Sequence, residues 1–335
     1  MLLERIKENP FLLAPMAGIT DIAFRTFMKR LGASVVTTEL VSANGLKHQS
    51  ERTRRLMRIC EEEQPVGIQI FGEDLDSLAF TAKECEQMGA SFVDLNFGCP
   101  VNKVVKKGAG SAVLKDLKFL TEILKTVKGA VDIPVTIKIR TGWNEEGKNA
   151  HEVTKIAHNE GITWVAIHGR TRAQAYNGKA DWDYIKSVYQ ESSIPIIGNG
   201  DLTSAEKAVS RIEGHFSTAV MIGRGALKNP WIFKESMAKM NDIEFSKEST
   251  VLPLIQDLYD EYLNHFEERV ALLQVKKFGS WFSSGYPHSA QFRQKLFSSK
   301  EPKVLWEVIL EYFSELNLLH QKDTSHEAFL MGGHG

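Results

Sequence analysis

The sequence has few of the residues that hold a secreted or metal-binding protein together. Its 335 residues include three cysteines, and no two of them form a Cys-x-x-Cys pair. An odd number of cysteines without such spacing argues against a disulfide framework and favours a reducing compartment. The histidines and cysteines also lack the spacing of zinc ligands, so we expect no metal site. A disulfide-stapled scaffold and a zinc module are therefore disfavoured.

Long apolar runs are missing as well. The first ten residues carry four charged side chains and no apolar segment of the kind found in secretory signals. No later stretch is long and apolar enough to cross a bilayer. We therefore expect a cytoplasmic protein that does not span a membrane.

Short runs rich in Val, Ile and Leu recur along the first 222 residues, and amphipathic stretches lie between them. Apolar runs without alternation are typical of parallel strands that are buried on both faces. Eight such strand–helix units predict an α/β fold, a closed (β/α)8 TIM barrel. A doubly wound sheet is disfavoured because no Gly-x-Gly-x-x-Gly turn follows the first strand. The predicted strands are residues 11–14, 35–38, 66–70, 92–96, 135–139, 164–168, 195–198 and 219–222.

The strand–helix rhythm stops after Trp231, and the rest of the chain has a different pattern. Residues 252–319 show helical periodicity without a convincing strand, which predicts a small all-α domain. The predicted organisation is a barrel domain at 1–240, a polar linker at 241–250, a helical domain at 251–320 and a disordered tail at 321–335.

Polar residues stand at or just past the carboxyl ends of the predicted strands. In a barrel all these ends open on one face, the face where active sites form. A ring of polar groups in register is difficult to explain by chance. Its members are Pro15, Met16, Ala17, Glu39, Gln69, Asn96, Lys138, Arg140, His168, Arg170, Asn199, Gly200, Asp201, Gly223 and Arg224.

Glycine-rich turns follow the last two predicted strands. They read Ile197-Gly198-Asn199-Gly200-Asp201 and Ile222-Gly223-Arg224-Gly225, and each leads into a helix. Glycine lets backbone N–H groups approach an anion, and the loops after strands seven and eight are the usual phosphate site of barrels. Arg224 could bind such a phosphate with two hydrogen bonds. The alternative is that the glycines only permit tight turns.

Three residues at this mouth have more than one interpretation. Lys138 suits either a Schiff base or a positive charge beside an electron-rich cofactor ring. Cys99 lies on a loop between Gly98 and Pro100, and an ordinary thiol pKa near ~8.5 suits a proton donor as well as a nucleophile. His168 could contact a cofactor or substrate, act as a general acid, or be a core histidine.

Taken together, these segments resemble the tRNA-dihydrouridine synthase family, and within it the bacterial type B branch. The resemblance covers nearly the whole predicted barrel, and the combination of the Pro-Met-Ala-Gly opening with Asn-x-Gly-Cys-Pro is its most specific part. The segments that carry it are Ala14-Pro15-Met16-Ala17-Gly18-Ile19-Thr20-Asp21, Gln69-Ile70-Phe71-Gly72, Asp94-Leu95-Asn96-Phe97-Gly98-Cys99-Pro100, Lys138-Ile139-Arg140-Thr141-Gly142-Trp143, His168-Gly169-Arg170-Thr171, Asn199-Gly200-Asp201 and Met221-Ile222-Gly223-Arg224-Gly225.

The resemblance implies FMN as cofactor, NADPH as reductant and tRNA as substrate. It implies that reduced FMN passes a hydride to C6 of a uracil while Cys99 gives a proton to C5, and that Asn96 contacts the uracil. Arg140 and Arg170 are predicted as further substrate contacts. The implied flavin contacts are Pro15, Met16, Ala17, Gln69, Lys138, His168, Asn199, Gly200, Asp201, Gly223 and Arg224.

Basic residues are concentrated in three segments although the whole chain has a net charge of −1. Residues 269–303 contain seven basic residues and one acidic residue, and we predict Lys276, Lys277 and Arg293 as tRNA contacts. Residues 47–58 and 103–107 add two more basic stretches. Phe278 stands where the resembled family often has histidine, which puts one RNA contact in doubt. The alternative is that these charges form an ordinary solvated face.

Three rival functions remain open at this point. A flavin barrel acting on a small molecule, such as a dihydroorotate dehydrogenase-like enzyme, would not need the basic helical segment. A lyase would use Lys138 as a Schiff base, and a non-catalytic RNA-binding protein would leave Cys99 without a role. The sequence does not reveal which uridine is reduced or the oligomeric state, although action as a monomer is compatible with it.

Overall fold

The computed structural model describes residues 2–246, 251–299, 301–316 and 322. It confirms the predicted fold class, because each of the eight expected strands is present and a helical region follows them. One further short strand, β3, pairs with β4 and was not expected. The strands are β1 Phe11–Leu13, β2 Val36–Thr37, β3 Val41–Ser42, β4 Val66–Phe71, β5 Phe92–Phe97, β6 Val135–Arg140, β7 Val165–His168, β8 Ile196–Asn199 and β9 Ala219–Ile222.

The strands form one parallel sheet that closes on itself. The order is β1-β9-β8-β7-β6-β5-β4-β2, and every named pairing is parallel. Two backbone hydrogen bonds join the ends of this path: Leu13 N donates to Val35 O at 3.0 Å, and Ser34 N donates to Phe11 O at 2.9 Å. The sheet is therefore a barrel, and the carboxyl ends of its strands share one mouth.

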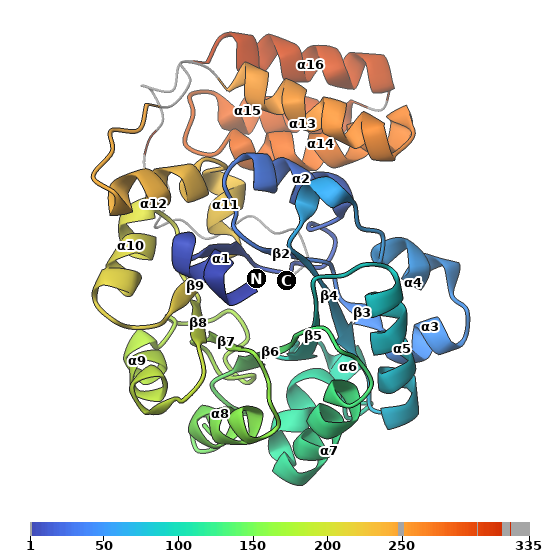
Figure 1. Ribbon diagram of the computed structural model, residues 1–335. Helices are drawn as coiled ribbons and strands as arrows, with labels where there is room; N and C mark the ends of the chain where they lie inside the picture. Colours follow the sequence, from blue (N-terminus) through green and yellow to red (C-terminus); the bar gives the residue numbers. More distant parts are fainter. Residues whose placement is uncertain (1, 247–250, 300, 317–321, 323–335) are drawn as a thin grey trace.

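Helices surround this barrel, and polar residues fix where several of them begin (Figure 1). The side chain of Asp74 caps α5, and that of Asp116 caps α7. Gly89 and Gly161 follow α5 and α8 with φ of +83° and +71°, the left-handed conformation that favours glycine at a helix end. These helices are α2 Ile22–Arg30, α3 Ala43–Lys47, α4 Glu51–Leu56, α5 Leu75–Gln87, α6 Asn102–Val105, α7 Leu117–Lys128, α8 Ala150–Asn159, α9 Trp182–Glu191, α10 Ala205–Glu213, α11 Gly225–Lys228 and α12 Ile232–Met240, with 3-10 turns at Glu61–Glu63 and Gly110–Lys115.

An amino-terminal helix, α1 (Leu2–Glu8), lies across the centre of the barrel in Figure 1. Its Ile6 is buried in a cluster with inward-facing residues such as Leu12, Phe92 and Trp164. This cluster fills the barrel interior, so the barrel is a packed core rather than a channel. The sequence did not predict this short helix.

Four helices follow the barrel: α13 Leu252–His265, α14 Glu268–Phe282, α15 Ser289–Ser298 and α16 Pro302–Ser314 (Figure 1). Of these, α13 packs against α2 and α14 against α11, and α15 and α16 pack on the other two. The ring of Phe278 stacks on Phe24 of α2 at 4.5 Å. Arg30 Nη2 of α2 pairs with Glu261 Oε2 at 2.5 Å. The helical region was predicted correctly, whereas the exact domain division stays a prediction. Outside the described residues lie 247–250 of the expected linker, 300 and 317–320 of the expected helical domain, and 321 and 323–335 of the expected tail.

Candidate active site

Strand register brings the predicted residues of β5 to β8 together at the mouth. Asn96 lies opposite Lys138, and His168 lies opposite Arg140 on one side and Asn199 on the other. Lys138 Nζ donates to Asn199 Oδ1 at 3.3 Å across the barrel. Burial lowers the pKa of Lys138 to about 8. The ammonium is therefore still mostly charged at neutral pH, but only narrowly so.

The loop that carries Cys99 is held on three sides. Asn96 Oδ1 accepts from Cys99 N at 2.8 Å, while Ser111 Oγ donates to Cys99 O at 2.9 Å and Arg140 Nε donates to Gly98 O at 2.9 Å. Burial raises the pKa of the Cys99 thiol, and the positive charges of Arg140 and Lys138 oppose that rise. The thiol thus stays protonated at neutral pH and faces the charges of the mouth, which suits a proton donor better than a nucleophile.

Two buried arginines organise the loops around this mouth. Arg140 Nη1 donates to Thr171 O at 2.9 Å and to Ala175 O at 2.7 Å. Arg170 Nη2 donates to both carboxylate oxygens of Asp201 at 2.9 Å and to Gly178 O at 2.7 Å. Most of their donors are therefore used inside the protein. Their predicted role as substrate contacts stays a prediction.

His168 is neutral in this setting. Burial places the pKa of its imidazole well below the usual value, and the positive charges of Arg140, Lys138, Arg170 and Arg224 lower it further. An imidazole of this kind cannot act as a cationic acid at pH 7. A role as a neutral contact to a cofactor or substrate remains compatible with its position.

The glycine turns after β8 and β9 have the close packing expected of a cofactor cradle. Gly200 has φ of +127°, and a Cβ placed on it would lie 2.6 Å from Ala180 Cβ. A Cβ on Gly225 would lie 2.1 Å from Leu202 O. A Cβ on Gly223 would lie 3.6 Å from Met16 Sδ, so the Pro15–Ala17 segment adjoins the β9 turn. Side chains at the first two positions would collide with the protein.

Positive charge exceeds negative charge next to these turns. Arg224 is half-buried, and its guanidinium carbon lies 5.1 Å from the Tyr176 ring centroid. Arg170 and Arg140 lie nearby, and Asp201 is the carboxylate paired with Arg170. A cationic cluster beside turns in which Gly200 and Gly225 leave no room for a side chain fits a phosphate-bearing cofactor such as FMN. The predicted role of Arg224, Gly200 and Gly223 as phosphate contacts stays a prediction.

Two residues of this site were not predicted from the sequence. Asp94 is fully buried within β5, and its carboxylate accepts from Gln69 Nε2 at 2.7 Å and from Thr136 Oγ1 at 2.6 Å. The sequence does contain a signal that could have identified Asp94, because a charged residue in the middle of an apolar strand is unusual. Tyr176 is exposed at the mouth between the guanidiniums of Arg140 and Arg224, on a loop that carries no sequence signal of its own.

The predicted RNA contacts of the helical region have different surroundings. Lys277 Nζ donates to Gly18 O at 2.5 Å, so this ammonium joins α14 to the first loop of the barrel. Lys276 Nζ donates to Ser299 O at 3.2 Å, and Arg293 Nη1 donates to Ser283 Oγ at 3.4 Å. Phe278 is fully buried in the interface between the helices and the barrel. Its ring packs against Phe24.

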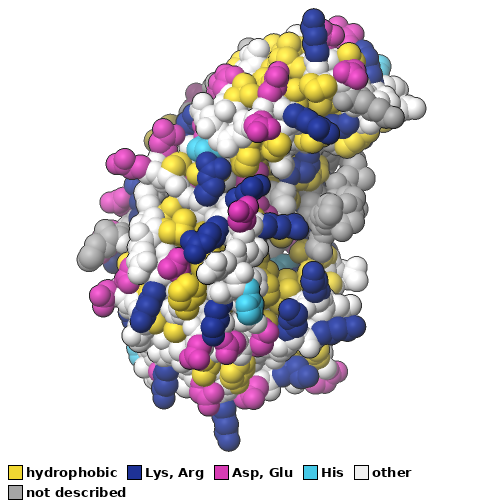
Figure 2. All heavy atoms as spheres, turned by 90° about the vertical axis from the view of Figure 1, so that its right-hand side faces the viewer, with side chains coloured by type: hydrophobic (Ala, Val, Ile, Leu, Met, Phe, Trp, Pro, Cys, Tyr) yellow, Lys and Arg dark blue, Asp and Glu magenta, His cyan; other side chains and the backbone are white. Residues whose placement is uncertain are grey.

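The basic stretches lie on the surface. Figure 2 views the side of α3, α4 and α5, and shows Lys and Arg side chains from the helical region down to the barrel, with acidic side chains among them. Lys47, Arg52, Arg55 and Lys103 are exposed. Lys47 Nζ pairs with Asp74 and Arg54 Nη1 with Glu84, at 3.3 Å and 3.6 Å. This face is thus mixed in charge, with ion pairs among its basic groups.

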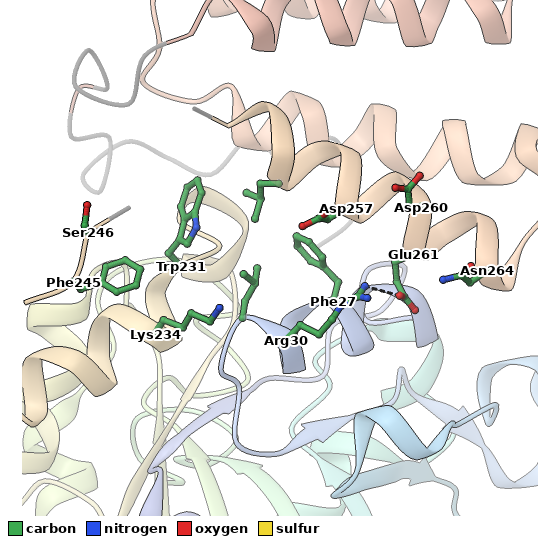
Figure 3. A pocket seen from close by; sticks show the side chains of 12 residues that line it. Phe27, Arg30, Trp231, Lys234, Phe245, Ser246, Asp257, Asp260, Glu261 and Asn264 are labelled. Atoms are coloured by element: carbon green, nitrogen blue, oxygen red, sulfur yellow. Dashed lines mark hydrogen bonds and ion pairs between the residues drawn. The ribbon is translucent and has the colours of Figure 1, made fainter. Parts of the chain in front are cut away.

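A cavity of about 480 Å³ lies apart from these residues, between α2, α12 and α13 (Figure 3). Figure 3 shows Phe27 and Arg30 below Asp257, Asp260 and Glu261. None of the predicted cofactor or substrate residues lines it. We therefore place the site at the barrel mouth, where the buried charges converge.

The described part of the chain contains neither a metal-binding cluster nor a membrane-spanning helix. It contains no group of three or more His, Cys, Asp or Glu side chains arranged to hold a metal ion. Nor does any helix in that part have the length and apolar character of a membrane span.

Two solved structures that share the barrel fold have little sequence in common with this chain. Histamine dehydrogenase from Rhizobium sp. 4-9 aligns with a TM-score of 0.52 and 13% identity over 70% of this chain and 46% of the other. A 2-naphthoyl-CoA reductase aligns with a TM-score of 0.52 and 14% identity over 70% of this chain and 51% of the other. This chain thus spans about half of each, and the likeness shows the barrel fold alone.

Sequence relatives are much closer. Residues 12–317 match the family model described as "Dihydrouridine synthase (Dus)". A "Probable tRNA-dihydrouridine synthase" of Rickettsia conorii is 36% identical over 313 residues, covering 92% of this chain and 95% of the relative. A "tRNA-dihydrouridine synthase B" of Pseudomonas putida is 39% identical over 316 residues, covering 92% of each. Since both the family model and these relatives span nearly the whole chain, it belongs to the dihydrouridine synthase family.

Proposed function

We propose that this protein is a tRNA-dihydrouridine synthase that reduces uridine in tRNA to 5,6-dihydrouridine, with FMN as cofactor and NADPH as reductant. Membership of the family and the names of relatives at 36% and 39% identity support the reaction class. The observation that carries the proposal is Cys99, a protonated thiol on a braced loop at the mouth, facing Lys138 and Arg140.

The proposed flavin site combines two parts of the mouth. Arg224, Asn199, Gly200, Asp201 and Gly223 would surround the phosphate end, where cations and close-packed turns favour an anion. The ring end would lie along the residues nearer the barrel centre. Those residues are Pro15, Met16, Ala17, Gln69, Lys138 and His168.

When bound, FMN would supply the hydride equivalent that the uracil ring takes up at C6. Cys99 then gives the thiol proton to C5, which completes the addition of two hydrogens across the 5,6 double bond. The resulting thiolate takes a proton back from solvent. Lys138 and Arg140 stabilise that thiolate because their positive charges favour the deprotonated form. The role of Asn96 is to bind the ring so that C5 meets the thiol.

The substrate must leave the folded RNA to reach this mouth. A stacked base cannot approach residues at the carboxyl ends of the strands, so the target nucleotide would be turned out of its stack. Lys276 and Arg293 on the helical region, together with the exposed basic groups of residues 47–58 and 103–107, are proposed to bind the tRNA backbone. We propose a cytoplasmic enzyme that acts as a monomer.

Nucleotide-resolution mapping of dihydrouridine in tRNA tests this function. A strain without the gene should lack dihydrouridine at one or more positions, and the wild-type gene should restore it. A gene carrying Cys99→Ala should fail to restore it although its product still binds tRNA. An unchanged dihydrouridine map in the deletion strain would contradict the proposal and favour a small-molecule substrate.

A further inference from the structure

A chain of side-chain hydrogen bonds runs from the barrel interior to the Cys99 loop. Asn96 Oδ1 accepts from two backbone groups, Cys99 N at 2.8 Å and Gly98 N at 3.1 Å. Backbone N–H groups are donors only, so the side-chain atom that faces them must be the oxygen. The amide of Asn96 therefore has a fixed orientation, with its nitrogen on the other side.

The orientation of Asn96 determines that of its neighbour. Asn96 Nδ2 donates to Gln69 Oε1 at 2.8 Å, so Gln69 must present its oxygen to Asn96. Gln69 Nε2 then points the other way and donates to Asp94 Oδ2 at 2.7 Å. Asp94 ends the chain as an acceptor, and its second oxygen accepts from Thr136 Oγ1 at 2.6 Å. The donors thus all point in one direction, from the backbone amides of the loop at one end to the carboxylate at the other.

These residues are withdrawn from water, so the direction of the chain matters. Asp94 and Gln69 are 2% exposed and Asn96 is 9% exposed. A reversed amide would set two N–H groups or two oxygens against each other, and no solvent is available to satisfy them. Burial raises the pKa of Asp94, whereas the hydrogen bonds from Thr136 and Gln69 favour its carboxylate form. Lys138, which lies opposite Asn96 on β6, adds a nearby positive charge that also favours the carboxylate.

We propose that Asp94 is a positioning residue: by accepting from Gln69 it keeps the Gln69 oxygen turned toward Asn96, and so stabilises the orientation in which Asn96 presents only an N–H group to the substrate. Both lone pairs of Asn96 Oδ1 are used by Gly98 and Cys99, and one of its two N–H groups is used by Gln69. The remaining N–H can donate to a ring carbonyl, as in uracil, and would repel an amino group, as in cytosine. This inference rests on the proposed function, and it adds to that function a role for Asp94, the residue that accepts at the end of the hydrogen-bond chain.

Substitutions at Asp94 and Gln69 test the direction of the chain. Asp94→Ala removes the terminal acceptor, whereas Asp94→Asn can keep one by turning its oxygen to Gln69 and its N–H to Thr136. Gln69→Glu sets a second carboxylate against Asp94. In the double variant Gln69→Glu/Asp94→Asn, the amide of residue 94 can donate to the new carboxylate, and Asn96 keeps its acceptor. Gln69→Glu and the double variant share the same change next to the flavin, so they are matched controls for each other.

Measuring two rates, flavin reduction by NADPH and flavin reoxidation by tRNA, distinguishes a role of Asp94 in positioning Asn96 from a role in flavin binding. NADPH-dependent flavin reduction without tRNA should change by less than about threefold in Asp94→Ala, while anaerobic reoxidation by unmodified tRNA should slow by about tenfold or more. Asp94→Asn should stay within about threefold of wild type in both rates. At pH 8, Gln69→Glu should slow reoxidation by about tenfold or more, and adding Asp94→Asn should recover at least about fivefold of that loss.

Full-rate reoxidation in Asp94→Ala would overturn the inference, and so would failure of Asp94→Asn to rescue Gln69→Glu. The same comparison in thermal unfolding covers a variant that loses activity by misfolding: the double variant should melt at a higher temperature than Gln69→Glu, and a lower temperature would count against the chain. If wild type produces no dihydrouridine, the proposed function fails, while the unfolding comparison still decides whether Asp94 sets the polarity.

Discussion

The barrel mouth and the helical region use their polar residues in opposite ways. At the mouth, Asp94, Arg140 and Arg170 are buried, and each makes several hydrogen bonds inside the protein. In the helical region the core is aromatic and apolar, with Phe278 and Phe313 fully buried. Arg269, Lys295 and Lys303 of that region are exposed, whereas Lys276, Lys277 and Arg293 are half-buried.

This difference teaches where large and small effects should fall. A buried charge acts at short range in a medium of low polarity, so its removal is costly and little affected by salt. An exposed charge near RNA acts through many weak, screened contacts. We therefore expect substitutions at the mouth to change rates and cofactor binding strongly, and substitutions of exposed lysines to change RNA affinity weakly and in a salt-dependent way.

Cys99→Ala should have the largest effect. Loss of a positioned proton donor should lower the rate of dihydrouridine formation by about 10² to 10⁴-fold. Affinity for tRNA, measured by filter binding, should stay within about twofold because the side chain carries no charge to the RNA. The matched control is Cys60→Ala, which removes a thiol before β4 and should retain activity. Equal rates for the two variants would remove the proton-donor role.

Arg224→Ala should come next, because it removes a half-buried cation beside the glycine turns. Charge-assisted hydrogen bonds to a phosphate contribute about 1.5–3 kcal/mol, so the FMN dissociation constant should rise by about 10 to 100-fold. Flavin fluorescence during titration of the apoprotein measures this constant. Arg211→Ala on α10, whose guanidinium stacks on Trp182 and Phe216, is the control and should leave it unchanged.

Titration of Lys138 should give the mouth a pH dependence that the helical region lacks. Because burial lowers its pKa to about 8, the ammonium loses its charge as pH rises through that value. If the charge is needed, the rate should fall by up to about tenfold per pH unit above 8. Lys138→Met should be slower at pH 7 and should lose this inflection; an unaltered profile would contradict the role.

Tyr262→Phe should test the contact between the two regions. The Tyr262 hydroxyl donates to Asp21 Oδ1 and Oδ2 at 3.0 Å, and both residues are withdrawn from solvent. Loss of this hydroxyl should cost about 1–3 kcal/mol of unfolding free energy, whereas Tyr259→Phe on the same helix should cost less. Burial already raises the pKa of Asp21, so the folded state holds its proton more tightly than the unfolded state. Stability therefore falls as pH rises through that pKa, and the variant's deficit should be larger at pH 7 than at pH 4.

Lys303→Ala should have the smallest effect. Lys303 is exposed at the start of α16, and loss of one phosphate contact should raise KM for tRNA by several-fold. The slope of log affinity against log salt should fall by roughly one unit. Lys118→Ala, on the exposed surface of α7 at the opposite end of the molecule, is the control (Figure 1). Identical salt slopes for wild type and Lys303→Ala would show that Lys303 does not contact the RNA.

The sequence predicted the barrel well because its information is local. Each strand is a short apolar run, and Gly89 and Gly161 end their helices in the conformation expected of them. The helix α1 and the strand β3 were missed because they are short, and their place depends on contacts with distant parts of the chain. Residues near a strand end could be assigned to the mouth, since parallel strands share that end.

The partners of those residues could not be predicted. Arg140 and Arg170 bind backbone carbonyls of a loop whose path the sequence does not specify. Lys277 meets Gly18, which is 259 positions away, only after two regions have packed together. The Asp94 chain depends on the register of β4 against β5, which places Gln69 beside Asp94. Strand ends thus locate a site, whereas hydrogen-bond partners require the assembled fold.

The most direct test of the account is a single turnover without oxygen. The purified protein, loaded with FMN and reduced with NADPH, is mixed with tRNA that lacks modifications, and flavin absorbance is followed alongside mass spectrometry of the RNA. We predict that flavin reoxidation and dihydrouridine formation proceed together, with one dihydrouridine for each flavin oxidised. Flavin that stays reduced in the presence of tRNA, or RNA that gains no mass, would contradict the account.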